Sequence, residues 1–299
     1  MRLSGIEYVI LFCSAAIISL ALNPLFRKVA LAKKILDAPN SERKIQRTAV
    51  PYLGGFSIIL SVFIVVALAL VTHNSDSEMY QRAASVLIPA LLLGLVGYVD
   101  DVRHLGAGSR FIAQLLAGIF TAAILISNET VGTSFNNKAI DAVLTIFWVV
   151  GIANAINFLD NMDGAASGVA AISAFGFFLV ATQAGQYLVA ALGLVLAGAC
   201  LGYLKLNWSP AKIYMGDAGS LFIGGFLAAV PLLIKWSAIR SEAHYAAVII
   251  PAIPLIEVAC LVVIRTWKGI PFYMGSPHHF AIYLRNKGWS RWSILMFSI

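Results

Sequence analysis

Long apolar runs separated by short polar segments dominate this chain. A helix needs about 20 apolar residues to cross the hydrocarbon core of a bilayer, and nine runs come close to that length. They lie near 5–26, 52–72, 83–99, 111–127, 139–158, 165–183, 186–204, 218–235 and 245–264. A tenth starts near Trp292 and is still apolar at Ile299, so either the sequence is truncated there or the last helix is cut short. The pattern predicts an all-α polytopic membrane protein of about ten transmembrane helices, forming a single domain over residues 1–299.

The composition agrees with this prediction. Hydrophobic residues make up 60% of the chain and charged residues 12%, whereas soluble domains carry about 25% charged residues. The first apolar run precedes its basic residues, and no small-residue cleavage site follows it, so we do not interpret it as a signal peptide. The three cysteines lie in apolar runs, and we expect buried side chains rather than disulfides or metal ligands at Cys13, Cys200 and Cys260.

The positions of the basic residues predict the orientation. If the N-terminus lies outside and the spans alternate, 16 of the 21 Lys and Arg residues fall in inner loops. Cytoplasmic loops are enriched in Lys and Arg, so this asymmetry favours an outside N-terminus. The net charge of +7 then belongs to the cytoplasmic face of the membrane protein and does not indicate nucleic-acid binding.

The same alternation places five polar clusters on the cytoplasmic face. They are the loop 27–51, the pair Asp100-Asp101, the segment 154–164, the segment 207–217 and the loop 265–291. Ordinary helix ends should be polar on both faces, so the pattern predicts a polar mouth on one side. A secondary transporter would carry its carboxylates near the bilayer midplane, where only Glu257 lies. We expect Glu257 to be paired or to face a helix interface.

The densest cluster holds Asn154, Asn157, Asp160, Asp163 and Gly164. Ionisable groups beside apolar spans are costly and indicate a functional site, although a polar helix end at the membrane surface is the simpler alternative. Residues three apart drift by roughly 60° around a helix, so one continuous helix cannot aim all four side chains at one point. We therefore expect the helix to end near Gly164, with the later members on a loop.

Two further acidic motifs lie at helix ends. Adjacent carboxylates at Asp100 and Asp101 point about 100° apart on a helix, so one can face the reaction while the other faces a supporting group. The alternative is a solvated helix end paired with Arg103 or Arg110. Asp217 lies where a helix begins, and it suits Mg²⁺, which takes a few carboxylates together with phosphates and water. It could equally cap that helix, and the two roles are compatible.

Two basic loops complete the candidate site. The pair His278-His279 is a weak zinc signal and favours phosphate binding or proton transfer, unless both are solvated loop histidines. Arg43, Lys44 and Arg47 can neutralise phosphates, or they can anchor the loop on anionic lipid.

In this order the motifs resemble the polyprenyl-phosphate N-acetylhexosamine-1-phosphate transferases, which are glycosyltransferase family 4. That family includes the undecaprenyl-phosphate N-acetylglucosamine-1-phosphate transferases and the phospho-N-acetylmuramoyl-pentapeptide transferases. The resemblance covers residues 37 to 285 and rests on Pro51-x-x-Gly54-Gly55, Asp100-Asp101, Asn154 to Gly164, Asn207-x-x-Pro210-Ala-x-x-Tyr214-Met-Gly-Asp217-x-Gly-Ser220 and the histidine loop.

The resemblance implies that a polyprenyl phosphate, such as undecaprenyl phosphate, attacks the β-phosphate of a UDP-N-acetylsugar and releases UMP. It implies Mg²⁺, or Mn²⁺ in its place, and a bacterial inner-membrane location with the site facing the cytoplasm. A homodimer is left open. The implied roles are metal binding by Asp217, deprotonation of the lipid phosphate by Asp100 or Asp101, and further active-site or substrate-binding roles for Asn154, Asn157, Asp160, Asp163, Asn207, Tyr214, Arg43, Lys44, Arg47, His278 and His279.

Departures from the family pattern bear on the sugar. Gln46 stands where the first loop often has histidine, and Phe280, Ala281 and Ile282 stand where the late loop often has more histidines. We therefore favour a UDP-N-acetylglucosamine-like donor, serving O-antigen or another envelope polymer, with the muramoyl-pentapeptide reaction as the alternative. A CDP-alcohol phosphatidyltransferase also has Asp-x-x-Asp-Gly, but Ser167-Gly168 follows here without the further spaced aspartates, so we reject it.

Overall fold

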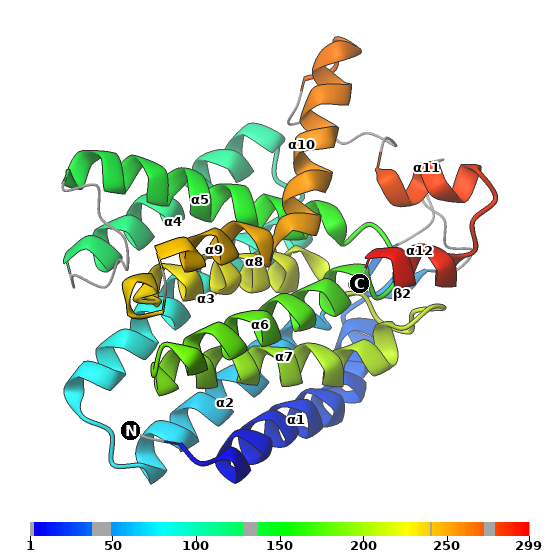
Figure 1. Cartoon of the computed structure of the whole chain (residues 1–299). Coiled ribbons are helices and arrows are strands. Elements are labelled where there is room, and N and C mark those ends of the chain that lie inside the picture. Colours follow the sequence, from blue (N-terminus) through cyan, green and yellow to red (C-terminus); the bar gives the residue numbers. More distant parts are fainter. Residues whose placement is uncertain (1–2, 38–48, 128–136, 240, 272–278, 299) are drawn as a thin grey trace.

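The computed structural model describes residues 3–37, 49–127, 137–239, 241–271 and 279–298. Eight helices in this part are long and apolar enough to cross a membrane, which confirms a polytopic helical membrane protein (Figure 1). They are α1 (Gly5–Ala32), α2 (Gly55–Thr72), α3 (Ser77–Arg103), α4 (Ala107–Ser127), α5 (Lys138–Leu159), α6 (Ala165–Gln183), α7 (Tyr187–Asn207) and α8 (Gly216–Leu233). The remaining helices are η1 (Trp236–Ala238), η2 (Ser241–Tyr245), α9 (Ala246–Ile249), α10 (Ala252–Trp267), α11 (Phe280–Asn286) and α12 (Arg291–Ser298).

The ninth expected span differs from the prediction. The run at 245–264 is interrupted between α9 and α10, and the two parts are bent by 56°. Pro251 lies at the break, where its ring and missing N–H disfavour a continuous helix. Figure 1 shows α10 leaving the body of the protein. The tenth run is α12, with eight residues up to Ser298, which agrees with the expectation of a last helix that is cut short. The described residues thus hold eight spans, or nine with the bent pair, followed by the short α12.

Glycine allows α3 and α8 to approach closely at the polar end of the protein. A Cβ placed on Gly97 of α3 would overlap the backbone carbonyl of Asp217, the second residue of α8. Close packing of small residues is a main source of helix association in lipid. Gly97 therefore allows the end of α3 to pack directly against the start of α8, where several of the polar motifs meet.

A short sheet joins the first inner loop to the start of α8. Strand β1 (Leu36–Asp37) pairs antiparallel with β2 (Val50–Pro51), and Tyr52 forms a bridge with Tyr214. The amide of Gly54 donates to the Tyr214 carbonyl at 3.0 Å, and a Cβ on Gly54 would lie 2.8 Å from that same oxygen. The Pro51-x-x-Gly54-Gly55 motif thus places α2 tightly against the loop before α8.

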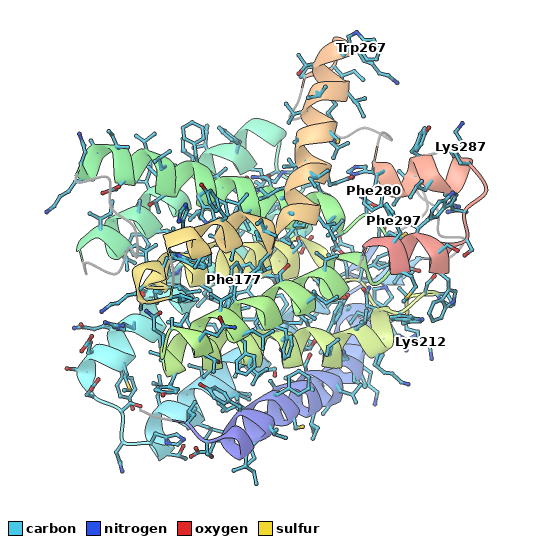
Figure 2. All side chains as sticks on the ribbon, viewed as in Figure 1. Phe177, Lys212, Trp267, Phe280, Lys287 and Phe297 are labelled. Carbon is cyan, nitrogen blue, oxygen red and sulfur yellow. The ribbon has the colours of Figure 1, made fainter. Side chains whose placement is uncertain are left out.

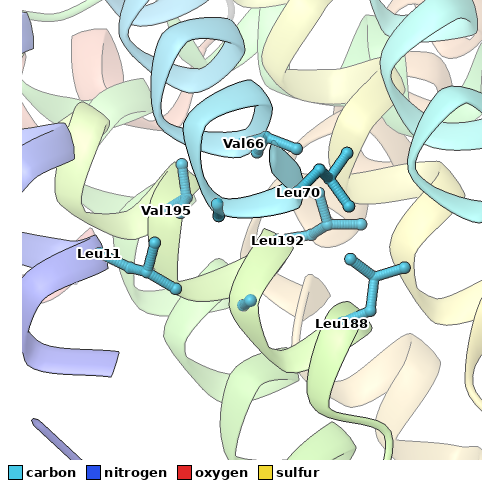
Figure 3. Close-up of a pocket in the computed structure, with 8 residues that line it drawn as sticks. Leu11, Val66, Leu70, Leu188, Leu192 and Val195 are labelled. Carbon is cyan, nitrogen blue, oxygen red and sulfur yellow. The ribbon is translucent and has the colours of Figure 1, made fainter. Parts of the chain in front are cut away.

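A small apolar pocket lies away from the polar motifs. It is formed by the first half of α1, the second half of α2 and the first half of α7 (Figure 3). Its lining contains no polar side chain and consists of Leu11, Val66, Ala69, Leu70, Leu188, Ala191, Leu192 and Val195. It therefore offers no group for catalysis.

The cysteine prediction was only partly right. Cys200 is buried, but Cys13 and Cys260 are exposed on the outer surfaces of α1 and α10. An apolar run shows that a helix enters the membrane. It does not show which face touches protein, because lipid-facing positions are equally apolar. All three thiols are free.

Candidate active site

Asp101, in the last turn of α3, holds the first turn of α8. Its Oδ1 accepts a hydrogen bond from the amide of Asp217 at 2.9 Å, and its Oδ2 accepts from the amide of Ala218 at 3.1 Å. Gly216 has a φ of +75°, and a Cβ there would lie 2.6 Å from Asp101 Oδ2. Asp101 therefore satisfies amides that a helix N-terminus leaves without an intrahelical partner, and both of its oxygens are engaged.

Asp100 points to a different partner. Its Oδ1 accepts from the amide of Leu105 at 2.8 Å, and Arg110 donates from Nη1 to its Oδ2 at 2.8 Å. The same Nη1 lies 3.2 Å from Asp217 Oδ2, so Arg110 joins the two carboxylates. The side chain of Asp100 is 7% exposed and that of Asp217 is 28% exposed. The two adjacent aspartates do point apart, as predicted.

Arg110 enters the site through this bridge, although sequence reasoning considered it only as a surface partner of the acidic pair. In the sequence, Arg110 stands out as a basic residue ten positions after Asp100, at the start of the next apolar run. This spacing carries no information about a contact with Asp217, which is more than 100 residues away along the chain.

The end of α5 supplies Asn157. Its Nδ2 donates to Asp217 Oδ1 at 2.8 Å and to Ser220 Oγ at 2.9 Å. Helix α5 ends at Leu159, somewhat before the expected Gly164, and Gly164 adopts a φ of +79° at the start of α6. Asp160 and Asp163 then lie in the connecting turn, which agrees with the prediction that the later members leave the helix.

The remaining polar residues of the cluster from Asn154 to Asp163 make different contacts. Asn154 donates to Gln114 Oε1 on α4 and to the Val150 carbonyl, both at 2.8 Å, and so points away from Asp217. Asp163 Oδ2 accepts from the amide of Ala211 at 3.1 Å. The side chains of this cluster thus point in different directions, as the drift around the helix requires. Asn157 is the member bonded to Asp217.

Asn207 connects two loops of the site. It is 2% exposed, its Oδ1 accepts from the amide of Gly164 at 2.9 Å, and its Nδ2 donates to the carbonyl of Ile213 at 3.0 Å. Tyr214 follows at once, and its amide donates to the carbonyl of Pro51 at 2.9 Å. Asn207 therefore positions the loop before α8, while the Tyr214 side chain is partly exposed at the site.

The described part of the late loop reaches the end of α5. His279 lies with its ring centroid 6.4 Å from that of Phe158, and its Nδ1 is 3.0 Å from Glu257 Oε1. The expectation that Glu257 is paired is confirmed. Arg265, further along α10, lies over the Phe158 ring at 5.2 Å and is 1% exposed. Four expected residues fall outside the described residues, namely Arg43, Lys44, Arg47 and His278.

Sequence reasoning did not include Arg265 in the site. Glu257, Leu261 and Arg265 follow one another at four-residue spacing, which puts them on one face of a helix, and all three are buried. That spacing was visible in the sequence, but the apolar run offered no reason to prefer this face over the others.

Comparison with known proteins identifies the family of this chain. The model of glycosyl transferase family 4 matches residues 83–235. The chain belongs to glycosyl transferase family 4. The matched segment contains Asp100, Asp101, Arg110, Asn154, Asn157, Asp160, Asp163, Asn207, Tyr214 and Asp217.

Relatives of this family 4 protein cover nearly the whole chain. One is a probable undecaprenyl-phosphate N-acetylglucosaminyl 1-phosphate transferase of Bacillus subtilis, 28% identical over 97% of this chain and 81% of the relative. Another is a phospho-N-acetylmuramoyl-pentapeptide-transferase of Bacillus pumilus, 31% identical over 97% of this chain and 94% of the relative. A third, with the same description, is from Bacillus cytotoxicus and is 30% identical over 94% and 90%. The family resemblance of the motifs is thus confirmed.

Asp160 gives this family 4 site an excess of negative charge. No described residue donates a hydrogen bond to its carboxylate. Burial, followed by the charges of Asp217, Asp101 and Asp163, raises the pKa of Asp160 well above its ordinary value of 3.8. A bound cation would relieve this repulsion, because an opposite charge favours the ionised carboxylate.

The acidic groups supply oxygen donors of the kind that a magnesium ion takes. Among the described residues, no three His, Cys, Asp or Glu side chains form a ready-made metal site. Mg²⁺ does not require one, since it is commonly held by one or two carboxylates together with phosphates and water. Asp217 and Asp160 offer only oxygen donors, and both are partly exposed, so the donor set suits Mg²⁺ rather than zinc.

Proposed function

We propose that this protein transfers an N-acetylhexosamine-1-phosphate from a UDP-N-acetylsugar to a polyprenyl phosphate and releases UMP. One observation carries the proposal: Asp217 is held at the start of α8 by Asp101, Asn157 and Arg110, beside Asp160, whose carboxylate accepts no hydrogen bond from a described residue. A compact acidic group with a bridging arginine suits a diphosphate and its cation. Membership of family 4 and the names of the relatives point to the same reaction.

Phosphoryl transfer depends mainly on positioning and charge neutralisation, and different residues supply each. An oxygen of the lipid phosphate attacks the β-phosphorus of the donor, the bond from that phosphorus to the bridging oxygen breaks, and UMP leaves with that oxygen. Asp217 and Asp160 would hold Mg²⁺, which when bound neutralises diphosphate charge. Arg110 adds positive charge beside them, and the start of α8 presents a helix dipole favourable to anions.

Asp100 is the better candidate for the base that takes a proton from the lipid phosphate. Both oxygens of Asp101 accept hydrogen bonds from backbone amides of α8, which cannot leave without moving that helix. Asp100 instead shares Oδ2 with the side chain of Arg110, which can rotate toward a phosphate. We assign the base role to Asp100 and a positioning role to Asp101.

The donor we propose is UDP-N-acetylglucosamine or a related UDP-N-acetylhexosamine, used at the cytoplasmic face of a bacterial inner membrane for O-antigen or another envelope polymer. A second candidate donor is UDP-N-acetylmuramoyl-pentapeptide, because several relatives 30–31% identical to this chain carry that transferase's name. Departures in the histidine loop at Phe280, Ala281 and Ile282 favour the first.

The deciding experiment is UMP release by the purified protein with undecaprenyl phosphate, Mg²⁺ and a panel of UDP-sugars that includes both candidates. We expect release with UDP-N-acetylglucosamine and loss of release on chelation. Release with the muramoyl-pentapeptide donor alone would establish the second candidate. No release with any donor would overturn the proposed function.

Asp217→Asn tests the metal assignment directly. The amide keeps the shape of the side chain but removes the charge that would hold Mg²⁺, so we expect UMP release to fall at least about 100-fold, or about 2.7 kcal/mol. The thermal unfolding midpoint should change little, because the helix-capping groups of Asp101 remain. Unchanged UMP release by this variant would remove Asp217 from the metal site.

A further inference from the structure

Glu257 is an acidic residue in the middle of an apolar helix, and the proposed chemistry does not use it. It lies on α10 and is 3% exposed. A buried carboxylate is costly unless it is paired and hydrogen-bonded, and Glu257 has both kinds of partner. His279 Nδ1 lies 3.0 Å from its Oε1, and the amide of Phe280 donates at 3.4 Å to each of its oxygens.

This contact favours a proton on one particular nitrogen of His279. An ionised carboxylate can only accept hydrogen bonds, so a hydrogen bond between His279 Nδ1 and Glu257 Oε1 then requires the proton on Nδ1, whether the ring is neutral or charged. Nε2 is then the only ring nitrogen left for a substrate oxygen. The side chain of His279 is 12% exposed, and its ring meets Phe158 edge-on, two residues before Asp160. The available nitrogen therefore belongs to a ring held at the acidic end of α5.

We propose that Glu257 is a positioning residue for the transfer reaction: it holds His279 in the Nδ1–H form and in one orientation, with Nε2 left for the substrate. A carboxylate that fixes a histidine tautomer in this way is common behind metal ligands and catalytic histidines. The inference rests on the proposed function and on the active-site role that the family resemblance implies for His279. The proposal also assigns a function to α10. This helix protrudes beyond the helical body, and Figure 2 shows Phe280, the first residue of α11, beside the lower half of α10.

A simpler possibility is that the Glu257–His279 pair only anchors the start of α11. Kinetic measurements on variants distinguish this structural role from a positioning role. The variants are Glu257→Ala, Glu257→Gln, His279→Ala and the double alanine variant, with Glu78→Ala as the control. Glu78 is an exposed acid of α3 that pairs with Arg82 on the same helix. We expect Glu257→Ala to lower kcat about 10- to 100-fold, the usual effect of removing such a partner, with little change in the KM for the UDP-sugar.

Two features of the result identify positioning. Glu257→Gln should recover most of kcat, because its amide oxygen still accepts from Nδ1–H. In the His279→Ala background, Glu257→Ala should have no further effect, because coupled residues are not additive. Wild-type kcat in Glu257→Ala, or an equal loss with and without His279, would overturn the proposal. Glu78→Ala should behave as the wild type.

A spectroscopic test does not depend on activity. The protein has five histidines, and ¹⁵N-histidine NMR in detergent, with His279→Asn to assign the signal, reports which ring nitrogen carries the proton. We expect Nδ1–H in the wild type and in Glu257→Gln, and a shift toward Nε2–H in Glu257→Ala. An unchanged proton position in Glu257→Ala overturns the proposal. If the wild type releases no UMP with any donor, the proposed function fails, while this measurement still decides whether Glu257 fixes the tautomer.

Discussion

The role of each carboxylate in this site depends on the groups that it contacts rather than on its residue type. Asp100 and Asp101 are adjacent, yet one pairs with Arg110 and the other caps α8. Tyr52 adds to this arrangement, because its hydroxyl donates to the backbone carbonyl of Asp101 at 3.0 Å. Burial, and then the charge of Asp101, raises the pKa of Tyr52, so the phenol stays protonated as a donor. The two aspartates therefore have different roles.

We expect Asp100→Asn and Asp101→Asn to fail in different ways. In Asp101→Asn, the new amide nitrogen would face a backbone N–H of α8, so the free energy of unfolding should fall by about 1–2 kcal/mol, the usual cost of a lost cap. Asp100→Asn keeps one oxygen for the Leu105 amide and should mainly lower kcat. Thermal unfolding and UMP release of both variants test this. Equal and mild losses in both would contradict separate roles.

Asp160 makes the stability of the metal-free protein depend on pH. Because its folded-state pKa is raised, the folded protein binds this proton more tightly than the unfolded chain does. Stability therefore falls as pH rises from about 4 through the folded pKa. Asp160→Asn removes this loss, so we expect its unfolding midpoint in EDTA to exceed the wild-type value at pH 8 and to approach it near pH 4. Parallel curves for the two proteins would contradict this assignment.

At the scale of elements, the breaks and contacts of helices decide where the site lies. The sequence located α1 to α8 within several residues, because each is a long apolar run. It missed the break before α10, although Pro251 and Pro254 were visible, since proline also occurs inside continuous helices of this protein, such as Pro24 in α1 and Pro89 in α3. Packing decides which proline interrupts a helix.

Gly97→Ala tests the close approach of α3 and α8. The new methyl group would overlap the backbone of Asp217, and overpacking of this kind costs about 1–3 kcal/mol. We expect a lower unfolding midpoint and reduced UMP release, because the start of α8 must shift. Gly151→Ala is the matched control, since a Cβ there has no atom within 4 Å. Wild-type behaviour of Gly97→Ala would show that the two helices can separate without cost to the site.

At the scale of the whole molecule, the polar motifs gather at one end. The ends of α3, α5 and α7 and the starts of α2, α4 and α8 meet there, near β2 in Figure 1. The alternation of spans predicted this gathering, and the contacts among the described residues of these motifs confirm it for that part of the chain. The side of the membrane on which this end lies is a prediction from the basic residues.

Cysteine labelling tests the orientation. In a variant without native cysteines, we expect Glu78→Cys to react with a membrane-impermeant maleimide in intact cells. Lys212→Cys, in the exposed loop before α8 (Figure 2), should react only after the membrane is opened. The opposite pattern would place the active site outside and contradict the positive-inside assignment.

The amino-acid sequence alone predicts the helical membrane fold, the polar groups at one end, and most of the residues that the structure brings together there. Hydropathy and charge decide how each segment lies in the bilayer, so these features follow from the local sequence. Long-range packing is needed to place Asp101 on the start of α8, Arg110 between Asp100 and Asp217, and Glu257 against His279. Asp101 and Asp217 are 116 residues apart, and such contacts depend on how glycine-lined helices pack, which no local periodicity specifies.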